Sequence, residues 1–514
     1  MSDFKKIFLI FFVFLFFGTK THANLSWNND LKNLFLSNQA IIYAVNIRTF
    51  NAKDSNKNGI IETKLGEERG NFLNAISRLD ELYKYGINTI QLLPVLPVGK
   101  TKALGTAGSL YAPASFNELN PQLKAPKSKL TIYEEMKKFV DECHKRKIRV
   151  IVDLPCCASY DLYLRKPELF LKDKDMNPVV PSDWTDVRLL DAGTNNQINN
   201  DVYNLYSGFV DLMIEMNVDG IRANVPTTKP SAFWKKLIDE TKNRNPQFLF
   251  IAEASPLSKQ ISNCPVFTTY GELLDAGFDG CYWTFSELKD WQTSKDLISS
   301  IKPLIKLSKK YSGEKAVLGN FVTHDQISPI LVNGPAFSEL IIWLNATLPV
   351  NTYYIDGFTT GDNYIYFWAN KKAKETFTDD DYYFVHRGQL DIFNFSRKPQ
   401  GKNVDILSNT IMANKFKEML KNTLINGTFH ELRTSSSSVF AYARSYNNKS
   451  IIVIGNLNFK AEQKVNISVP HLTKKLISVP VKIKNTPQVS KNKITTLLSP
   501  GEVQVLLFES LDFQ

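Results

Sequence analysis

The chain has 514 residues, of which 43% are hydrophobic and 22% are charged. These values are ordinary for globular proteins, and the length indicates two to four structural units, or fewer where one of them is an α/β barrel. Aromatic residues make up 12% and Gly and Pro number 24 and 23, so the chain is neither disordered nor collagen-like. The 62 Lys and Arg residues against 51 Asp and Glu residues give a formal net charge of +11. Because Lys is scattered along the whole chain, we expect a Lys-rich solvated surface and no nucleic-acid partner.

The N-terminus has the pattern of a secretory signal peptide. Lys5 and Lys6 precede an apolar run over residues 7–17, and Ala23 supplies a small residue just before the expected cut. An uncleaved membrane anchor is the alternative, but this run is shorter than the roughly 20 residues that span a bilayer. We therefore expect residues 1–23 to be removed, the protein to be secreted or periplasmic, and no stable membrane anchor to remain.

The five cysteines do not form the framework of a disulfide-rich protein. An odd number leaves at least one unpaired, and Cys156 and Cys157 are adjacent, so a bond between them would be strained. Neither a CxxC pair nor a Cys/His ligand spacing occurs, which excludes a zinc site of the usual kind.

Short β-type runs alternate with segments of helical spacing from about residue 40 to residue 425. Phe72, Ile76 and Leu79, for example, recur at helical spacing, and Gly86 follows as a stop signal. The β-type runs are Ile41–Val45, Ile87–Leu93, Ile148–Leu154, Val218–Asn224, Phe248–Glu253, Phe278–Trp283, Ala316–Phe321 and Asn351–Ile355. Eight strands separated by helices predict an α/β fold, a (β/α)₈ TIM barrel within residues 24–425.

Two parts of the chain depart from this alternation. Residues 155–200 are dense in Pro, Asp and Asn and predict an inserted subdomain after the third strand. The tail contains β-type runs such as Ser450–Asn456 and Val503–Phe508 without helical spacing. We therefore predict a C-terminal antiparallel β-sandwich domain over residues 430–514.

Polar residues that could carry chemistry stand where the predicted barrel strands end, which is where a TIM barrel places its active site. The third strand ends near Asp153, and the fourth ends with Arg222 and Asn224, whose spacing of two puts them on the same face. The fifth ends at Glu253, and the seventh leads into His324-Asp325. Any one of these is more often structural than catalytic, but together they predict a site.

The motifs around these residues resemble the catalytic regions of the α-amylase superfamily of glycoside hydrolases. The matching segments are Gly108–Tyr111, Ile151–Asp153, Gly220–Asn224, Ala252–Glu253 and Asn320–Gln326. Four of these motifs occur in the family's order, and the resemblance extends over nearly all of the chain beyond the predicted signal peptide.

The resemblance implies a retaining mechanism on α-linked glucose units, with an α-glucan oligosaccharide or polysaccharide as the partner. Glu253 matches the general acid/base, Asp325 the Asp that holds sugar hydroxyls, and Arg222 the arginine beside the nucleophile. Two carboxyl groups are the physical minimum, one ionised to attack and one protonated to release the leaving group. Further matches with substrate-binding positions are Tyr111, His324 and Asp153.

The sequence departs from this family where the nucleophile should stand, because that position holds Asn224. A neutral amide is a poor nucleophile and supplies no negative charge to an oxocarbenium-like transition state. Cys157 and Ala158 replace the family's Asn-His pair, and Ser109 stands where many members carry His. An engineered replacement of Asp by Asn is the alternative explanation for Asn224, but it does not explain Cys157 and Ala158.

Three functional hypotheses follow from this departure. The first is an α-amylase-family protein that has lost most of its hydrolytic activity. The second is a non-catalytic glucan- or partner-binding protein on an inactive barrel. The third is an active retaining glycosidase or transglycosidase that uses another group in place of the missing carboxylate.

A loop after the first strand has the spacing of a calcium site. Oxygen-bearing side chains at alternate positions and a Gly at the sixth place suit a hard cation, although the twelfth place holds Leu65 rather than Glu. Relatives in the family bind calcium in a similar loop, and a plain Asn-rich turn is the alternative. The expected ligands are Asp54, Asn56, Asn58, Glu62 and the carbonyl of Ile60.

Overall fold

The computed structural model describes residues 27–55, 61–104, 107–182, 184–362, 404–447, 449–470, 472, 476–478, 483–509 and 511. Eight parallel strands close into a barrel with the order β1-β10-β9-β8-β7-β6-β3-β2. These strands are β1 (Ile41–Val45), β2 (Thr89–Leu92), β3 (Arg149–Leu154), β6 (Gly220–Ala223), β7 (Leu249–Ala252), β8 (Gly280–Cys281), β9 (Ala316–Gly319) and β10 (Asn351–Ile355). Each lies within a predicted run, so the predicted TIM barrel is confirmed. The predicted signal peptide lies outside the described residues and stays a prediction.

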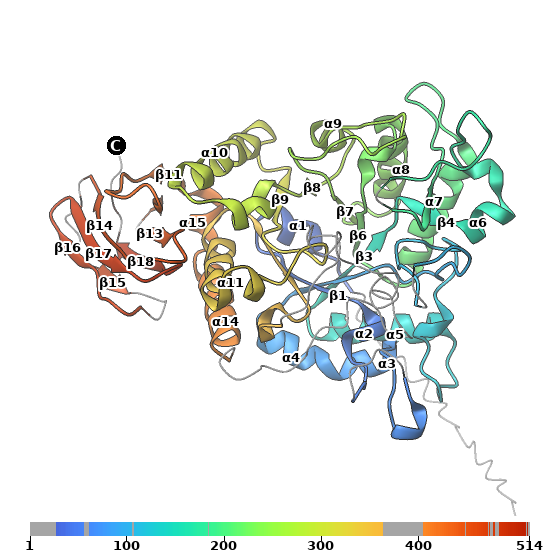
Figure 1. Cartoon of the computed structure of the whole chain (residues 1–514), viewed down its shortest axis with the longest axis horizontal. Coiled ribbons are helices and arrows are strands. Elements are labelled where there is room, and N and C mark those ends of the chain that lie inside the picture. The colour runs from blue at the N-terminus through green and yellow to red at the C-terminus, as the bar shows by residue number, and fades with distance from the viewer. Residues whose placement is uncertain are drawn as a thin grey trace, which may run out of the picture.

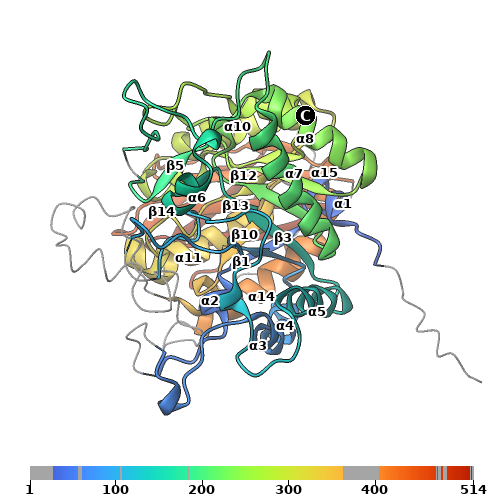
Figure 2. The same ribbon diagram turned by 90° about the vertical axis from the view of Figure 1, so that its right-hand side faces the viewer.

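Helices surround the barrel strands, as Figures 1 and 2 show. Their bounds are α1 (Leu31–Leu36), α2 (Ile47–Phe50), α3 (Phe72–Ala75), α4 (Leu79–Lys84), α5 (Ile132–Lys145), α7 (Asn200–Glu215), α8 (Ser231–Arg244), α9 (Tyr270–Asp275), α10 (Ser294–Lys310), α11 (Pro329–Thr347), α14 (Val404–Met419) and α15 (Lys421–Asn426). Local signals explain where they begin. Thr131 and Glu134 form a reciprocal capping box at the start of α5, which buries Met136, Phe139 and Val140 on one face.

The insertion after β3 contains β4 (Cys157–Ser159), α6 (Tyr160–Arg165) and β5 (Val187–Leu189). Strands β4 and β5 pair antiparallel, with Cys157 opposite Leu189. A small apolar cluster includes Cys156, Cys157, Leu189 and Cys264 and joins this insertion to the loop after β7. The insertion therefore packs beside the carboxyl ends of β3 and β6.

The C-terminal domain consists of a five-stranded sheet, β11-β12-β13-β18-β15, and a three-stranded sheet, β14-β17-β16. The strands are β11 (Thr428–Glu431), β12 (Val439–Tyr446), β13 (Lys449–Asn456), β14 (Gln463–Ser468), β15 (Leu476–Ser478), β16 (Gln488–Ser490), β17 (Lys493–Leu498) and β18 (Val503–Glu509). Apolar side chains of both sheets, such as Ile452 and Ile494, form one core. The predicted antiparallel sandwich is confirmed.

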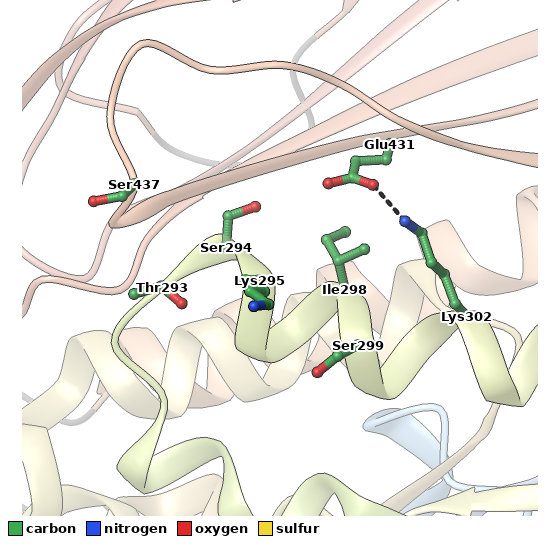
Figure 3. A pocket seen from close by; sticks show the side chains of 8 residues that line it. All are labelled: Thr293, Ser294, Lys295, Ile298, Ser299, Lys302, Glu431 and Ser437. Carbon is green, nitrogen blue, oxygen red and sulfur yellow. Dashed lines mark hydrogen bonds and ion pairs between the residues drawn. The ribbon is translucent and has the colours of Figure 1, made fainter.

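The sandwich docks on the barrel through α10, at the end of the molecule away from the insertion (Figure 1). The backbone N–H of Ser294 donates to the carbonyl of Ser437 at 2.8 Å, and Lys302 pairs with Glu431 at 2.7 Å. Figure 3 shows these side chains around a pocket between the two domains.

Among the described residues no helix combines the length and apolar character needed to cross a membrane.

A buried carboxylate anchors the N-terminal segment to the bottom of the barrel. Asp219, just before β6, accepts hydrogen bonds from Trp27 Nε1 at 2.6 Å, His144 Nε2 at 2.8 Å and the backbone N–H of Val150 at 2.8 Å. The Trp27 and His144 rings stack with centroids 3.9 Å apart. One side chain thus connects the first described residues, α5, β3 and β6.

We expect Asp219→Ala to lower the free energy of unfolding by about 2 to 4 kcal/mol, because two buried donors and the partly buried Trp27 lose their acceptor. Denaturant unfolding at pH 7 measures this loss. The control is Asp211→Ala, which removes a half-exposed partner of Arg244 and should change stability by less than about 1 kcal/mol. Equal effects of both substitutions would contradict the anchoring role of Asp219.

Candidate active site

The structure brings most of the predicted site residues together at the carboxyl ends of the barrel strands. Asp153 lies in β3 and Arg222 in β6, while Asn224 and Glu253 directly follow β6 and β7. The loop after β9 supplies His324 and Asp325, and the loop between β2 and α5 supplies Tyr111. The predicted convergence of these strand ends is therefore seen in the structure.

Arg222 is the centre of this group of side chains and is fully buried. Its Nη1 donates to Asp153 Oδ2 at 2.8 Å, its Nη2 forms an ion pair with Glu253 Oε1, and its Nε donates to the hydroxyl of Tyr282 at 3.2 Å. Burial acts against the charge of Arg222, but the carboxylates of Asp153 and Glu253 hold its pKa well above the usual value. One guanidinium on β6 thus fixes two carboxyl groups from the two strands that flank it, β3 and β7.

Asp153 is completely buried and accepts hydrogen bonds at both oxygens. Gln91 Nε2 donates to Oδ1 at 2.8 Å, and the Tyr111 hydroxyl donates to Oδ2 at 2.7 Å, beside Arg222. Burial raises the pKa of Asp153 to about 7, while Arg222 and the Tyr111 hydroxyl favour the charged form. Asp153 therefore orients other side chains and is closed off from solvent.

The rings of Tyr111 and His324 lie parallel at one side of the site. Their centroids are 5.7 Å apart with an interplanar angle of 5°, and the Tyr111 hydroxyl lies 3.0 Å from His324 Nε2. Asp325 lies at the rim, where its side chain is 45% exposed and its Oδ2 is 3.6 Å from His324 Nε2. These side chains offer an aromatic face and polar groups, which is the combination that sugar rings require.

Asn224 is hydrogen-bonded directly to Glu253. Its Nδ2 donates to Glu253 Oε2 at 2.7 Å, and the backbone N–H of Val225 donates to the same oxygen at 3.0 Å. Val225 has φ +36°, a left-handed conformation that is costly for a β-branched residue. Oε2 of Glu253 thus accepts two hydrogen bonds, while Oε1 forms the ion pair with Arg222.

The substituted family positions are part of the same region. Cys157 and Ala158 lie in β4 and are buried, and Ser109 Oγ accepts a hydrogen bond from the backbone N–H of Tyr111 at 3.2 Å. Ser109 therefore orients the loop that carries Tyr111. Neither Cys157 nor Ala158 supplies the amide or imidazole that the family places there.

Three contributors to the site were not predicted: Gln91, Tyr282 and the backbone N–H of Val225. Gln91 is a polar residue inside an apolar strand, and this was the signal that could have revealed it. Tyr282 directly follows β8, so it also stands at a strand end. The Val225 contact depends on a backbone conformation that side-chain chemistry does not reveal.

The predicted calcium loop is only partly within the described residues, since Asn56, Asn58 and Ile60 lie outside them. At its base, Glu67 is buried and accepts hydrogen bonds from the backbone N–H groups of Ser55 at 2.8 Å and Glu62 at 3.0 Å. Glu67 is a further carboxylate close to Asp54 and Glu62 that the sequence pattern did not reveal. In the part of the chain that the structure describes, no group of three or more His, Cys, Asp or Glu side chains is placed to hold a metal.

No protein-family model matches the chain. The chain is 25% identical over 389 residues to an alpha-1,4-glucan:maltose-1-phosphate maltosyltransferase of Arcanobacterium haemolyticum, covering 72% of this chain and 52% of that protein. It is 23% identical over 423 residues to a maltosyltransferase of the same name from Streptomyces coelicolor, covering 78% of this chain and 58% of that protein. The chain thus spans little more than half the length of these curated relatives.

The solved structures agree with the sequence matches. A maltogenic alpha-amylase from Thermotoga neapolitana superposes with a TM-score of 0.65 at 19% identity, covering 92% of this chain and 99% of that one. An Anoxybacillus alpha-amylase gives a TM-score of 0.67 at 15% identity, covering 93% and 99%. The chain therefore resembles the α-amylase superfamily in sequence and shares its fold. The barrel with its C-terminal β-domain is the fold that these α-amylases share with this chain.

The raised pKa of Asp153 predicts a pH-dependent difference in stability. The folded state binds this proton more tightly than an unfolded chain with a pKa near 3.9, so the stability from this group is full below about pH 4 and is lost as the pH rises to about 7. Relative to Asp153→Asn, we expect the free energy of unfolding of the unaltered chain to fall by up to about 4 kcal/mol across this window.

Denaturant unfolding of both proteins between pH 4 and pH 8 measures this difference. Taking the difference between the two proteins removes the contribution of the other titrating groups. A difference that stays constant with pH would show that Arg222 and Tyr111 keep Asp153 ionised throughout, and would contradict the assignment.

Proposed function

We propose that this protein binds α-linked glucans at the mouth of the barrel and hydrolyses them weakly or not at all. The observation that carries the proposal is the 2.7 Å hydrogen bond from the Asn224 amide to Glu253. In a retaining glycosidase two carboxyl groups lie about 5–5.5 Å apart with the scissile bond between them. Here an amide takes the place of one carboxyl group and contacts the other directly.

Two physical consequences support impaired catalysis. An amide forms no glycosyl ester and supplies no negative charge to the transition state, and each ~1.36 kcal/mol of lost stabilisation slows the reaction tenfold. Asn224 and Val225 also donate to Oε2 of Glu253 and Arg222 pairs with Oε1, so contacts within the protein occupy both oxygens that an acid would use toward the leaving group. Neither the nucleophile position, Asn224, nor the acid position, Glu253, is therefore arranged for catalysis.

Binding has a separate basis in the residues that remain. The half-buried Tyr111 ring and the rim carboxylate of Asp325 are accessible to a sugar, and the buried His324 ring lies parallel to Tyr111 behind them. The curated relatives carry the name alpha-1,4-glucan:maltose-1-phosphate maltosyltransferase, and several solved neighbours are alpha-amylases. An α-linked glucan is therefore the ligand that the site supports best.

An active glycosidase or transglycosidase is the second candidate, favoured by the maltosyltransferase names of the relatives. It requires another group in place of the missing carboxylate. Asp153 also pairs with Arg222, but it is fully buried and held by Gln91, Tyr111 and Arg222. A nucleophile must reach the anomeric carbon, so the binding function is better supported than this alternative.

We expect the unaltered chain to release no reducing sugar from maltooligosaccharides above the buffer rate. Asn224→Asp should raise the rate by at least about tenfold, because it restores the charge and the ester-forming group. Recovery should be incomplete, since Cys157 and Ala158 leave the adjoining subsite without its usual polar contacts. Reducing-sugar release over several hours measures both rates.

The matched control is Asn224→Asp combined with Glu253→Gln, which should return the rate to background because the acid is lost. Circular dichroism of all three proteins checks that they are folded. Robust turnover by the unaltered chain would contradict the proposal and would favour the second candidate.

We also propose that calcium binds the loop from Asp54 to Glu62. The alternating oxygen-bearing side chains and the buried Glu67 at the base of the loop support a site for a hard cation. Millimolar calcium should raise the melting temperature by several degrees, and Asp54→Ala should abolish that rise, whereas Glu118→Ala, an exposed control, should retain it. A melting temperature that does not respond to calcium would count against the site.

A further inference from the structure

Cys156 and Cys157 bring their thiols together beside the candidate active site, a feature that the proposed glucan binding does not use. Successive side chains of an extended segment point to opposite sides. Here the turn between β3 and β4 instead places the two Sγ atoms 3.3 Å apart. None of the five cysteines forms a disulfide in the structure.

The surroundings of the pair are unusual for buried cysteines. Lys229 is buried and its Nζ donates to the carbonyl of Cys156 at 2.7 Å. A third thiol, that of Cys264, lies in the same apolar cluster and donates to the carbonyl of Val266 at 3.3 Å. Beside these groups, the backbone N–H of Cys156 is 3.5 Å from Asn224 Oδ1, so the pair lies next to the partly exposed floor of the site.

The two thiols differ in acidity. The hydrogen bond from the Cys157 thiol lowers the pKa of Cys156 despite burial, and the nearby Lys229 ammonium acts in the same direction. The same hydrogen bond, together with burial, raises the pKa of Cys157 well above its usual value. One thiol is therefore disposed to react as a thiolate while its neighbour keeps a proton.

We propose that Cys156 and Cys157 are a site of reversible oxidation, at which a peroxide converts the pair to a disulfide between adjacent residues. Cys156 sulfur attacks the peroxide O–O bond and gives a sulfenic acid and water, for hydrogen peroxide as the oxidant. The Cys157 sulfur then displaces the sulfenic hydroxyl, which leaves with a proton as a second water, and the S–S bond forms. The peroxide is reduced by two electrons and the two thiols are oxidised.

Geometry limits both the oxidant and the stability of the product. Cys156 and Cys157 are each only 2% exposed, which favours a small oxidant over a protein or glutathione disulfide. A trans peptide holds adjacent Cα atoms about 3.8 Å apart, below the roughly 4.4–6.8 Å of ordinary disulfides. The bond is therefore strained and readily reduced by thiols, as a regulatory rather than a structural disulfide is.

The test is peroxide treatment of the reduced, folded full-length chain, followed by alkylation and peptide mass spectrometry. We expect the Cys156 and Cys157 thiols to disappear together at least about tenfold faster than those of Cys143 and Cys281, in one peptide with an internal S–S bond. Dithiothreitol should restore both. Mapping the unaltered chain does not depend on the folding of any variant.

Variants identify which thiols are used. Cys157→Ser should stop disulfide formation and leave a Cys156 sulfenic acid, while Cys143→Ser, a buried cysteine of α5, should oxidise as the unaltered chain does. Cys264→Ser should also retain the bond. The proposal is overturned if Cys156 and Cys157 stay reduced under peroxide, or if the disulfide formed contains Cys264.

Discussion

A single buried guanidinium organises the mouth of this barrel. Arg222 is a charge inside the protein, and such a charge is tolerated only when it is paired and hydrogen-bonded. Its pairs with Asp153 and Glu253 connect β3, β6 and the residue after β7, and its contact with Tyr282 adds the end of β8. The positions of the remaining groups follow, because Asp153 in turn holds Tyr111 and Tyr111 contacts His324.

The residue at position 224 changes what this framework can do. A carboxylate there would face Glu253 as a like charge, and repulsion would keep the two groups apart with room for a sugar between them. The amide has the opposite tendency, because it donates to Glu253 and draws the two side chains into contact. Under the proposed function, the same framework binds a sugar ring, and the contact between Asn224 and Glu253 prevents the reaction. The strained backbone of Val225 adds a second donor to Glu253 and strengthens this arrangement.

Much of the fold could be predicted from the sequence because local patterns and global topology agree. All eight barrel strands fall within the predicted runs, since strands that are buried on both faces leave continuous apolar signals such as Ile41–Val45. The site residues at strand ends could be predicted for the same reason, because topology alone brings Asp153, Arg222 and Glu253 to one mouth. What could not be predicted depends on side-chain direction. Residue spacing does not specify the backbone path on which three observed contacts depend. These contacts are the Asn224–Glu253 hydrogen bond, the hydrogen bond from Gln91 to Asp153 and the approach of the Cys156 and Cys157 thiols.

The proposed function requires that the site binds an α-glucan and leaves it intact. Calorimetric titration of maltoheptaose into the unaltered chain, with chromatography of the sugar recovered afterwards, measures binding and turnover in one sample. We expect a saturable isotherm with one site per chain, and maltoheptaose recovered undegraded after hours of contact. Recovery of shortened or lengthened oligosaccharides, or the absence of any saturable heat at millimolar sugar, would contradict it.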